Sequence, residues 1–364
     1  MKPIKNLYLS AIHQNAGKTT IALGLYKLLK DRGFKAAFMK PIGQKVVTVH
    51  HKNVDKDSYL IGKVFRCLRF KDMSPVTVGR GFTEQYIFKP REEVLRNQIL
   101  RSFKILSRNH NMMIVEGTGH AGVGSVIDLS NADVAGMLGS KVIIISGGGV
   151  GRSIDEIMLN KALFDLKGVE ILGVIINKVR PEKYQKIKRV LERGLKNKGI
   201  RLLGVIPSDP ILSSPTMEQI MNQLDLKLLC GKENLSKHVE HAIVAAMEPR
   251  NMMTYIRDGT LVITSGDRID NMLVSISAHL MSKRKKFNIA GIILTGGLVP
   301  DAPIVKLLQE SKIPVLLSKD DTYKVAGKIE TSTFKIEKTD KDKILEATRL
   351  VRKNVDLGLI LKYL

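Results

Sequence analysis

Short apolar runs alternate along the chain with longer stretches in which apolar residues recur every three or four positions. The short runs predict strands at residues 7–10, 36–39, 112–116, 142–146, 172–177 and 202–206. The longer stretches predict helices at residues 19–32, 57–67, 91–109, 154–165 and 182–197. This alternation is typical of an α/β fold in which helices cover both faces of a parallel sheet.

Proline and serine interrupt this pattern between Pro207 and Pro215. Clusters of these residues mark loops between elements. A second α/β series follows, with strands expected at 261–264, 289–294 and 315–318 and helices at 267–281 and 302–310. A chain of 364 residues has room for about two domains. We therefore expect a first domain at residues 1–213 and a smaller α/β domain at 214–364.

The segment between the first predicted strand and helix carries Gly17, Lys18 and Thr19, which is the context of a phosphate-binding loop. In such a loop, backbone N–H groups and a helix N-terminus converge on anionic oxygens. Lys18 would reach the phosphates and the Thr19 hydroxyl would ligate Mg²⁺. The full pattern has a glycine where this chain has Ile12, so an ordinary strand–helix turn is the alternative. The predicted nucleotide-binding residues are Asn15, Ala16, Gly17, Lys18, Thr19 and Thr20.

Charged side chains also follow other predicted strands. Glu116 ends one strand and Lys40 follows another, and ligands of open α/β sheets bind at the carboxyl ends of strands. A buried carboxylate needs a metal ion or a cation beside it. We expect Glu116 to join the metal site, with a surface glutamate as the alternative. Lys40 would point into the same crevice, although a lysine there is more often at the surface. Asp57, near Asp55, is either a helix cap or a metal ligand.

Two glycine-rich segments leave alternatives open. Residues 117–124 would let a ligand approach the backbone closely, or form a flexible loop. Residues 146–151 loosely resemble a dinucleotide fingerprint, but we prefer a close-packed turn. His13 and His120 flank the predicted site and are expected to be solvated.

Composition excludes several classes of protein. Two cysteines, Cys67 and Cys230, cannot make a disulfide framework, and no Cys/His cluster has zinc spacing. The sequence has no signal-peptide pattern and no apolar run of about 18 residues. We therefore expect a cytoplasmic protein without a membrane partner.

The net charge of +24 raises the question of whether the protein binds nucleic acid. Residues 1–213 contribute most of the excess, partly through the basic run at 180–201. Such a run is usually a solvated helix face. Aromatic content is 5% and no stacking motif is present, so a nucleic-acid partner is not expected.

Taken together, the motifs resemble a family. Ala-Gly-Lys-Thr-Thr (16–20), Lys-Pro-Ile-Gly (40–43), the Asp55/Asp57 segment, Val-Glu-Gly-Thr-Gly (115–119) and Gly-Val-Ile-Ile-Asn-Lys-Val (173–179) occur in the same order in dethiobiotin synthetase and its relatives. The chain is most similar to the N-terminal part of long bacterial phosphotransacetylases. There a dethiobiotin-synthetase-like domain precedes a DRTGG domain, whose naming residues correspond to Gly266-Asp267-Arg268 and Thr295-Gly296-Gly297.

The resemblance implies ATP and Mg²⁺ as cofactors and a P-loop NTPase fold. Lys18 and Thr19 would hold the phosphates and the metal ion, and Asp57 and Glu116 would complete the metal site. Lys40 would act with Lys18 on a phosphorylated or carboxylated intermediate. The adenine edge would be read by Asn177, with Pro207 nearby. The family also implies a homodimer, and a metabolic enzyme is a further expected partner.

Departures from the family pattern limit the transfer of its chemistry. Dethiobiotin synthetase has Gly-Thr-Asp-Thr where this chain has Ala-Ile-His-Gln at 11–14, so biotin chemistry is in doubt. The acetyl-transferring domain lies beyond the DRTGG domain in phosphotransacetylases, and this chain stops at Leu364, so acetyl transfer is not expected.

Two functions are carried forward. The first is a nucleotide-binding regulatory or assembly protein in which the DRTGG domain relays the nucleotide state. The second is an ATP-dependent ligase or carboxylase acting on an unknown small substrate. A nucleic-acid-associated or non-binding protein remains a minor alternative. We also expect nucleotide binding to survive removal of the residues from Pro215 onward.

Overall fold

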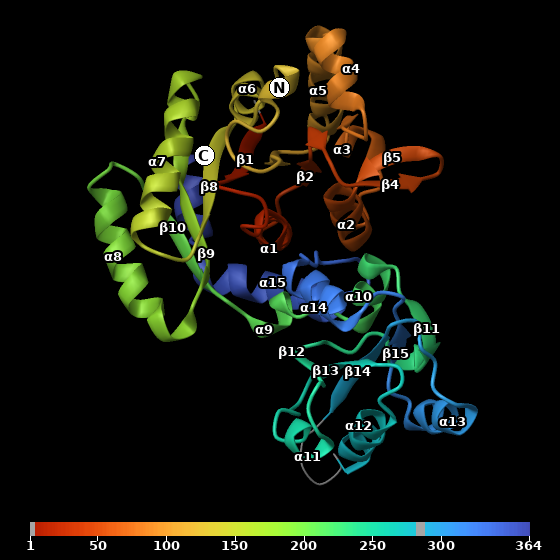
Figure 1. The fold of residues 1–364 in the computed structure, drawn as a ribbon. Helices are drawn as coiled ribbons and strands as arrows, with labels where there is room; N and C mark the ends of the chain where they lie inside the picture. The colour runs from red at the N-terminus through yellow and green to blue at the C-terminus, as the bar shows by residue number, and fades with distance from the viewer. Residues whose placement is uncertain (1–3, 282–287) are drawn as a thin grey trace. The chain divides into compact units, whose positions relative to one another are not determined.

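The structure is a computed structural model that describes residues 4–281 and 288–364. The chain divides into two compact units (Figure 1). The first unit combines residues up to Leu212 with Ile336–Leu364, and the second is Ser213–Lys335. The second unit is therefore an insertion in the sequence of the first.

A six-stranded parallel sheet forms the centre of the first unit, in the order β10-β9-β8-β1-β7-β2. Its strands are β1 Lys5–Ala11, β2 Ala36–Met39, β7 Met112–Glu116, β8 Lys141–Gly147, β9 Ile171–Val179 and β10 Leu202–Pro207. The six predicted strands of this half are confirmed, with ends displaced by at most two residues. Strand order reverses beside β1, and such a switch point opens a crevice at the carboxyl ends of the strands.

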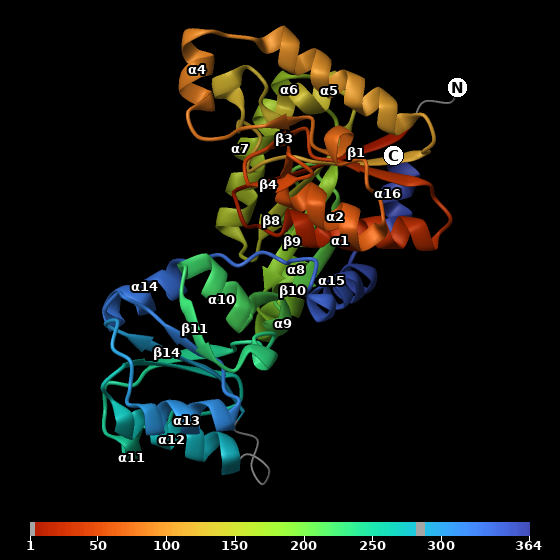
Figure 2. The same ribbon diagram turned by 90° about the vertical axis from the view of Figure 1, so that its right-hand side faces the viewer.

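Helices cover both faces of this sheet, as the alternating pattern predicted. Figure 2 shows α1 (Lys18–Asp31) and α15 (Lys341–Asn354) on one side and α5 (Glu92–Ser107), α6 (Asn131–Met137) and α7 (Gly151–Leu166) on the other. α8 packs against β10. The remaining elements are β3 Ile42–Gly43, β4 Val46–Val49, β5 Lys52–Asp55, β6 Val76–Thr77, α2 Lys56–Phe65, α3 Phe70–Met73, α4 Phe82–Phe88, α8 Tyr184–Lys196, α9 Pro210–Ser213, α16 Leu357–Tyr363 and the short 3₁₀ turns Ser125–Ile127 and Pro181–Lys183.

The C-terminal helices belong to the core of the first unit, whereas the sequence pattern assigned residues 214–364 to a second domain. Val351 of α15 is buried and packs against Gly24 of α1, where an added Cβ would lie 2.4 Å from the valine Cβ. Arg352 pairs with Asp31 at the end of α1. The local periodicity of a helix does not say which distant apolar face it will cover, so sequence pattern alone could not make this assignment.

The second unit contains a five-stranded sheet in the order β11-β15-β14-β13-β12, parallel except for the edge strand β11. One face packs on α11, α12 and α13, and the other on α10 and α14 (Figure 1). Its elements are α10 Met217–Leu224, β11 Lys227–Cys230, the 3₁₀ turn Lys232–Asn234, β12 His241–Val244, α11 Pro249–Met252, β13 Thr260–Ser265, α12 Ile269–Met281, β14 Ile289–Thr295, α13 Ala302–Ser311, β15 Val315–Leu317 and α14 Thr322–Thr331.

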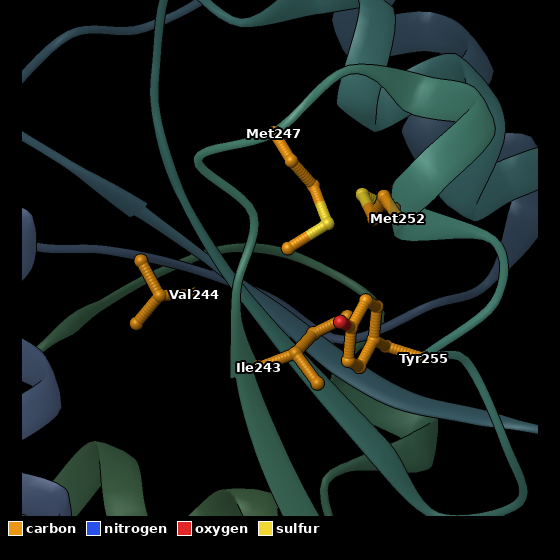
Figure 3. A pocket seen from close by; sticks show the side chains of 5 residues that line it. All are labelled: Ile243, Val244, Met247, Met252 and Tyr255. Atoms are coloured by element: carbon orange, nitrogen blue, oxygen red, sulfur yellow. The ribbon is translucent and has the colours of Figure 1, made fainter.

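One small cavity of about 220 Å³ lies at the end of β12. Figure 3 shows the apolar side chains that line it, namely Ile243, Val244, Met247, Met252 and Tyr255. None of the helices within the described residues combines the length and apolarity needed to cross a bilayer.

Candidate functional site

The predicted phosphate-binding loop lies at the carboxyl end of β1, where the strand order reverses. Gly17 adopts φ 97° and Asn15 adopts φ 65°, so the loop turns through left-handed backbone before α1 begins at Lys18. The N–H of Ile21 donates to the carbonyl of Gly17 at 3.1 Å, which closes the first helical turn. The first N–H groups of a helix have no intrahelical acceptors, so this turn can receive an anion.

Two side chains from the end of β9 donate hydrogen bonds to the backbone of this loop. Asn177 Nδ2 donates to the carbonyl of Ala16 at 2.9 Å, and Lys178 Nζ donates to the carbonyl of Asn15 at 2.8 Å. Asn177 lies so close that a Cβ added to Gly17 would be 2.1 Å from Nδ2. Burial lowers the pKa of Lys178. Asn177 therefore contacts the loop backbone, a role that the sequence pattern did not predict.

A buried charge cluster stands beside the loop. Lys40 Nζ lies 3.1 Å from Glu116 Oε1, contacts Asp57 Oδ2 and lies 3.9 Å from Asp55 Oδ1. Burial by itself would lower the pKa of Lys40, but Asp57, Glu116 and Asp55 raise it well above its usual value. The lysine is therefore charged at neutral pH. Lys40 is not at the surface, and the same holds for Glu116, since both are less than 5% exposed.

The sheet register explains how these side chains meet. Met39 pairs with Val115 across β2 and β7, so the next residues, Lys40 and Glu116, lie side by side at the carboxyl ends of these strands. Asp55 caps α2 by accepting from the N–H of Asp57 at 2.9 Å. The capping role therefore belongs to Asp55, while the side chain of Asp57 is directed to Lys40.

The residues expected to hold Mg²⁺ fit that ion. Thr19 Oγ1 donates to Glu116 Oε1 at 3.0 Å, so a hydroxyl and a carboxylate of the required kind are adjacent at the end of the loop. Mg²⁺ binds oxygen ligands and usually keeps several waters beside phosphate oxygens. The described residues contain no group of three or more His, Cys, Asp or Glu side chains that could hold a metal by themselves.

Asn131 organises the glycine-rich loop after β7. It accepts a hydrogen bond from Tyr8 Oη at 2.7 Å and donates to the carbonyls of Thr118 and His120 at 2.7 and 2.6 Å. The N–H of Ala121 donates to Asn160 Oδ1 at 2.8 Å. This loop is therefore hydrogen-bonded along its length, which argues against the flexible loop that the sequence left open for residues 117–124. Sequence reasoning missed Asn131, although the Ser130–Asp133 capping pattern of α6 marks its position.

The remaining candidates are placed as follows. A Cβ at Gly148 would lie 3.0 Å from the Lys178 carbonyl oxygen, so this segment is a close-packed turn, as preferred. His13 and His120 are exposed. Pro207 pairs with Val179 at the same sheet edge as Asn177.

The DRTGG residues lie next to one another in the second unit. The N–H of Gly266 donates to the Thr295 carbonyl at 3.2 Å, so the two halves of the motif meet at the ends of β13 and β14. Gly296 and Gly297 both adopt positive φ, 79° and 72°. A Cβ at Gly266 would lie 1.9 Å from the carbonyl oxygen of Leu298. Close backbone packing therefore accounts for Gly266, and positive φ accounts for Gly296 and Gly297.

Comparison with known proteins supports this architecture. Residues 5–216 match the model of an AAA domain family. The chain belongs to this family. Residues 5–216 form a P-loop domain of the dethiobiotin-synthetase-like type. Residues 219–332 match the DRTGG domain, so the two kinds of domain follow each other as the motifs indicated.

Curated relatives extend over both domains. A phosphate acetyltransferase of Nitratidesulfovibrio vulgaris is 30% identical over 96% of this chain and 50% of its own length. One from Synechocystis sp. is 28% identical over 99% of this chain and 52% of its own. The chain thus spans about half the length of the curated relatives it matches, and it corresponds to the N-terminal part of long phosphotransacetylases.

A solved structure of the CBS and DRTGG domains of a Clostridium perfringens pyrophosphatase is 16% identical, covering 48% of this chain and 85% of its own, with a TM-score of 0.29. A likeness at that level supports no functional inference.

Proposed function

We propose that this protein binds ATP with Mg²⁺ at the carboxyl edge of its first sheet and uses the bound state in a regulatory or assembly role. The observation that carries the proposal is the junction of β1 and α1. There, left-handed loop backbone, buried Lys18 and the Thr19–Glu116 hydrogen bond come together at a switch point.

Each site residue has a role in this proposal. Asn15, Ala16, Gly17 and Thr20 offer backbone to the phosphates, and Lys18 adds its charge. Thr19, Asp57 and Glu116 hold Mg²⁺, which neutralises phosphate charge when it is bound. Asn177 and Pro207 border the base. Lys40 holds Asp57 and Glu116 in place and supplies positive charge to a transferred group.

The inserted arrangement supports regulation. The chain leaves the first unit after β10, forms the DRTGG unit and returns as α15, which packs on α1, the helix that begins at the phosphate loop. Lys338, in the returning segment, donates to the hydroxyl of Tyr59 on α2 at 3.1 Å. The returning chain therefore contacts two helices that carry site residues. We also propose that the protein self-associates and that its target is a metabolic enzyme.

Titration calorimetry with ATP and Mg²⁺ tests nucleotide binding. We expect micromolar binding that Lys18→Ala abolishes. Lys30→Ala, at the other end of the same helix and exposed, is the matched control and should bind as the unaltered protein does. Binding that survives Lys18→Ala would contradict the assignment of the loop.

A ligase or carboxylase is the second candidate, favoured by the buried Lys40 cluster. A fixed cation beside a metal site is what phosphoryl transfer requires, because positioning and charge neutralisation do most of the catalysis. This candidate requires ATP turnover that rises with one class of small amine or acid. Lys40→Met should then abolish turnover while ATP still binds. If no metabolite of a full panel raises ATP turnover, the ligase or carboxylase is excluded and the regulatory role remains.

A further inference from the structure

The outer face of α8 carries a line of positive charge. The helix has one carboxylate, Glu192, and five cations, which are Lys186, Lys188, Arg189, Arg193 and Lys196. All five cations are exposed, whereas Leu191 and Leu195 are buried. At about 100° per residue, four of the cations fall within an arc of about 80°, centred about 160° from the buried leucines. These four residues, which we call the basic stripe, are Lys186, Arg189, Arg193 and Lys196.

No carboxylate of the protein neutralises the basic stripe. Other helices, α1, α7 and α15, hold internal ion pairs, namely Lys27–Asp31, Arg152–Glu156 and Arg349–Glu346. In the part of the chain that the structure describes, no ion pair includes a cation of the basic stripe. Its members follow one another three or four positions apart, where like charges repel each other. The first turn of α8 also holds Lys186 and no acidic residue, although the helix dipole disfavours a cation there. The stripe therefore destabilises its own helix, and a polyanion would relieve this repulsion.

The spacing of the basic stripe matches the backbone of a double helix. From Lys186 to Lys196 the helix rises about 15 Å. One strand of a DNA duplex carries a phosphate about every 3.4 Å along the axis, so the stripe would face about four phosphates. Lys183 and Lys198, which are both exposed, extend the line at its two ends. The net charge of +24 adds a long-range attraction for such a partner.

The side chains of this face favour nucleic acid over other anionic partners. A helix that binds a lipid surface buries apolar side chains beside its cations, and the arc of the basic stripe contains none. The core of a protein–protein interface is enriched in aromatic residues and depleted of lysine. Hydrogen bonds to DNA go mostly to phosphate and sugar, and arginine and lysine are common donors. The sequence-based expectation of no nucleic-acid partner rests on the lack of aromatic residues for stacking, which phosphate contacts do not require.

We propose that the basic stripe binds the phosphate backbone of a DNA duplex without reading its base sequence. This inference goes beyond the proposed function and does not depend on ATP binding, because α8 holds none of the candidate nucleotide-site residues. Binding of this kind is driven by counterions released from the phosphates. The affinity should therefore fall with salt along a slope set by the number of contacts.

Fluorescence anisotropy of a labelled duplex of about 20 base pairs, titrated with the full-length chain at about 50–200 mM salt, tests this inference. We expect micromolar affinity at the low end of that range. Replacing all four residues of the basic stripe by glutamine should lower the affinity at least tenfold. Arg193→Gln alone should reduce the slope of log affinity against log salt by about 1. Circular dichroism should not change, because glutamine favours a helix about as well as lysine and arginine do.

The matched control removes the same charge from another helix. Four exposed cations lie on α5 or directly after it, and they are Arg96, Arg101, Lys104 and Arg108. Replacing these four by glutamine should lower the affinity less than threefold. The inference would be overturned if the unaltered protein did not bind the duplex at low salt. An equal loss in the two fourfold variants would also overturn it, because net charge rather than the stripe would then attract the DNA.

Two further probes distinguish DNA from other polyanions. Poly-glutamate represents an acidic protein segment, and vesicles of phosphatidylglycerol and phosphatidylcholine in equal parts represent a membrane. Both should bind more weakly than the duplex at an equal concentration of negative charge, and tighter binding of either would refute the choice of DNA. Two duplexes of unrelated sequence should bind equally well. A tenfold preference for one of them would contradict contact through the backbone alone.

Lysine footprinting locates the contact on the unaltered protein. With the duplex bound, Lys186 and Lys196 should be protected from acetylation, whereas Lys104 on α5 should react as it does without DNA. Stripe lysines that stay reactive in the complex would place the DNA elsewhere and overturn the inference.

Discussion

Single residues decide the shape of the phosphate loop. Gly17 is the residue at which the loop needs both left-handed backbone and the absence of a side chain, because Asn177 fills the space beside it. Gly33, at the end of α1, shares the positive φ but has open space around its Cβ position. Substituting each glycine in turn therefore distinguishes the effect of backbone strain from the effect of steric overlap.

Gly17→Ala should weaken ATP binding at least tenfold, because the new Cβ must displace Asn177 and with it the hydrogen bond to Ala16. Gly33→Ala should cost roughly 1 kcal/mol of stability through backbone strain and leave ATP affinity unchanged. Calorimetry and thermal unfolding of both variants measure these effects. Equal affinity in the two variants would show that Asn177 does not shape the loop.

A second residue-scale feature is the turn between β4 and β5. His50 and His51 form its two-residue tip with φ 46° and 60°. Asn-Gly is strongly preferred in such turns because both central residues need positive φ. His50→Asn combined with His51→Gly should therefore raise the free energy of unfolding by about 1 kcal/mol. A lower melting temperature in the double variant would contradict this reading of the turn.

At the scale of elements, α6 fixes the loop beside the metal site. Ser130 and Asp133 form a capping box at its start, and Asn131 between them holds Thr118 and His120. Burial raises the pKa of Asp133, but hydrogen bonds from Lys167 and Ser130 outweigh it, and the pKa is lowered overall from 3.8. The carboxylate form is thus favoured in the folded protein.

A lowered pKa in the folded state contributes stability above the unfolded pKa, and the contribution is lost as pH falls through the folded pKa. Asp133→Asn should therefore destabilise the protein by about 1 kcal/mol at neutral pH. The difference from the unaltered protein should shrink as pH falls below 3.8. Chemical unfolding at several pH values measures it. A difference that does not change with pH would show that the charge of Asp133 is not involved.

At the scale of the whole molecule, the first unit is completed by residues that follow the inserted DRTGG unit. Leu350, Val351 and Ile360 are buried in the same core as β1 and α1. Fully burying such side chains stabilises a fold by roughly 1.5–3 kcal/mol each. Their combined contribution is comparable with the whole stability of an ordinary domain, about 5–15 kcal/mol.

A fragment of residues 1–213 should therefore be poorly folded and bind ATP weakly, contrary to the expectation from sequence pattern. Adding a peptide of residues 336–364 should raise its melting temperature and restore binding. A peptide with Val351→Asp is the control and should do neither. A fragment that melts cooperatively and binds ATP without the peptide would show that α15 is dispensable.

The sequence by itself determined the α/β class, the strands of the first sheet, the position of the phosphate loop and the order of the two domains. These features follow from local periodicity and from short motifs, whose signal lies within a few neighbouring residues. Tertiary structure decided the rest. Asn177 reaches a loop 161 positions away, Asn131 organises the strand end at Glu116, and α15 packs on a helix more than 300 residues earlier. Such contacts depend on which faces meet after the sheet has formed, and local patterns carry no information about that choice.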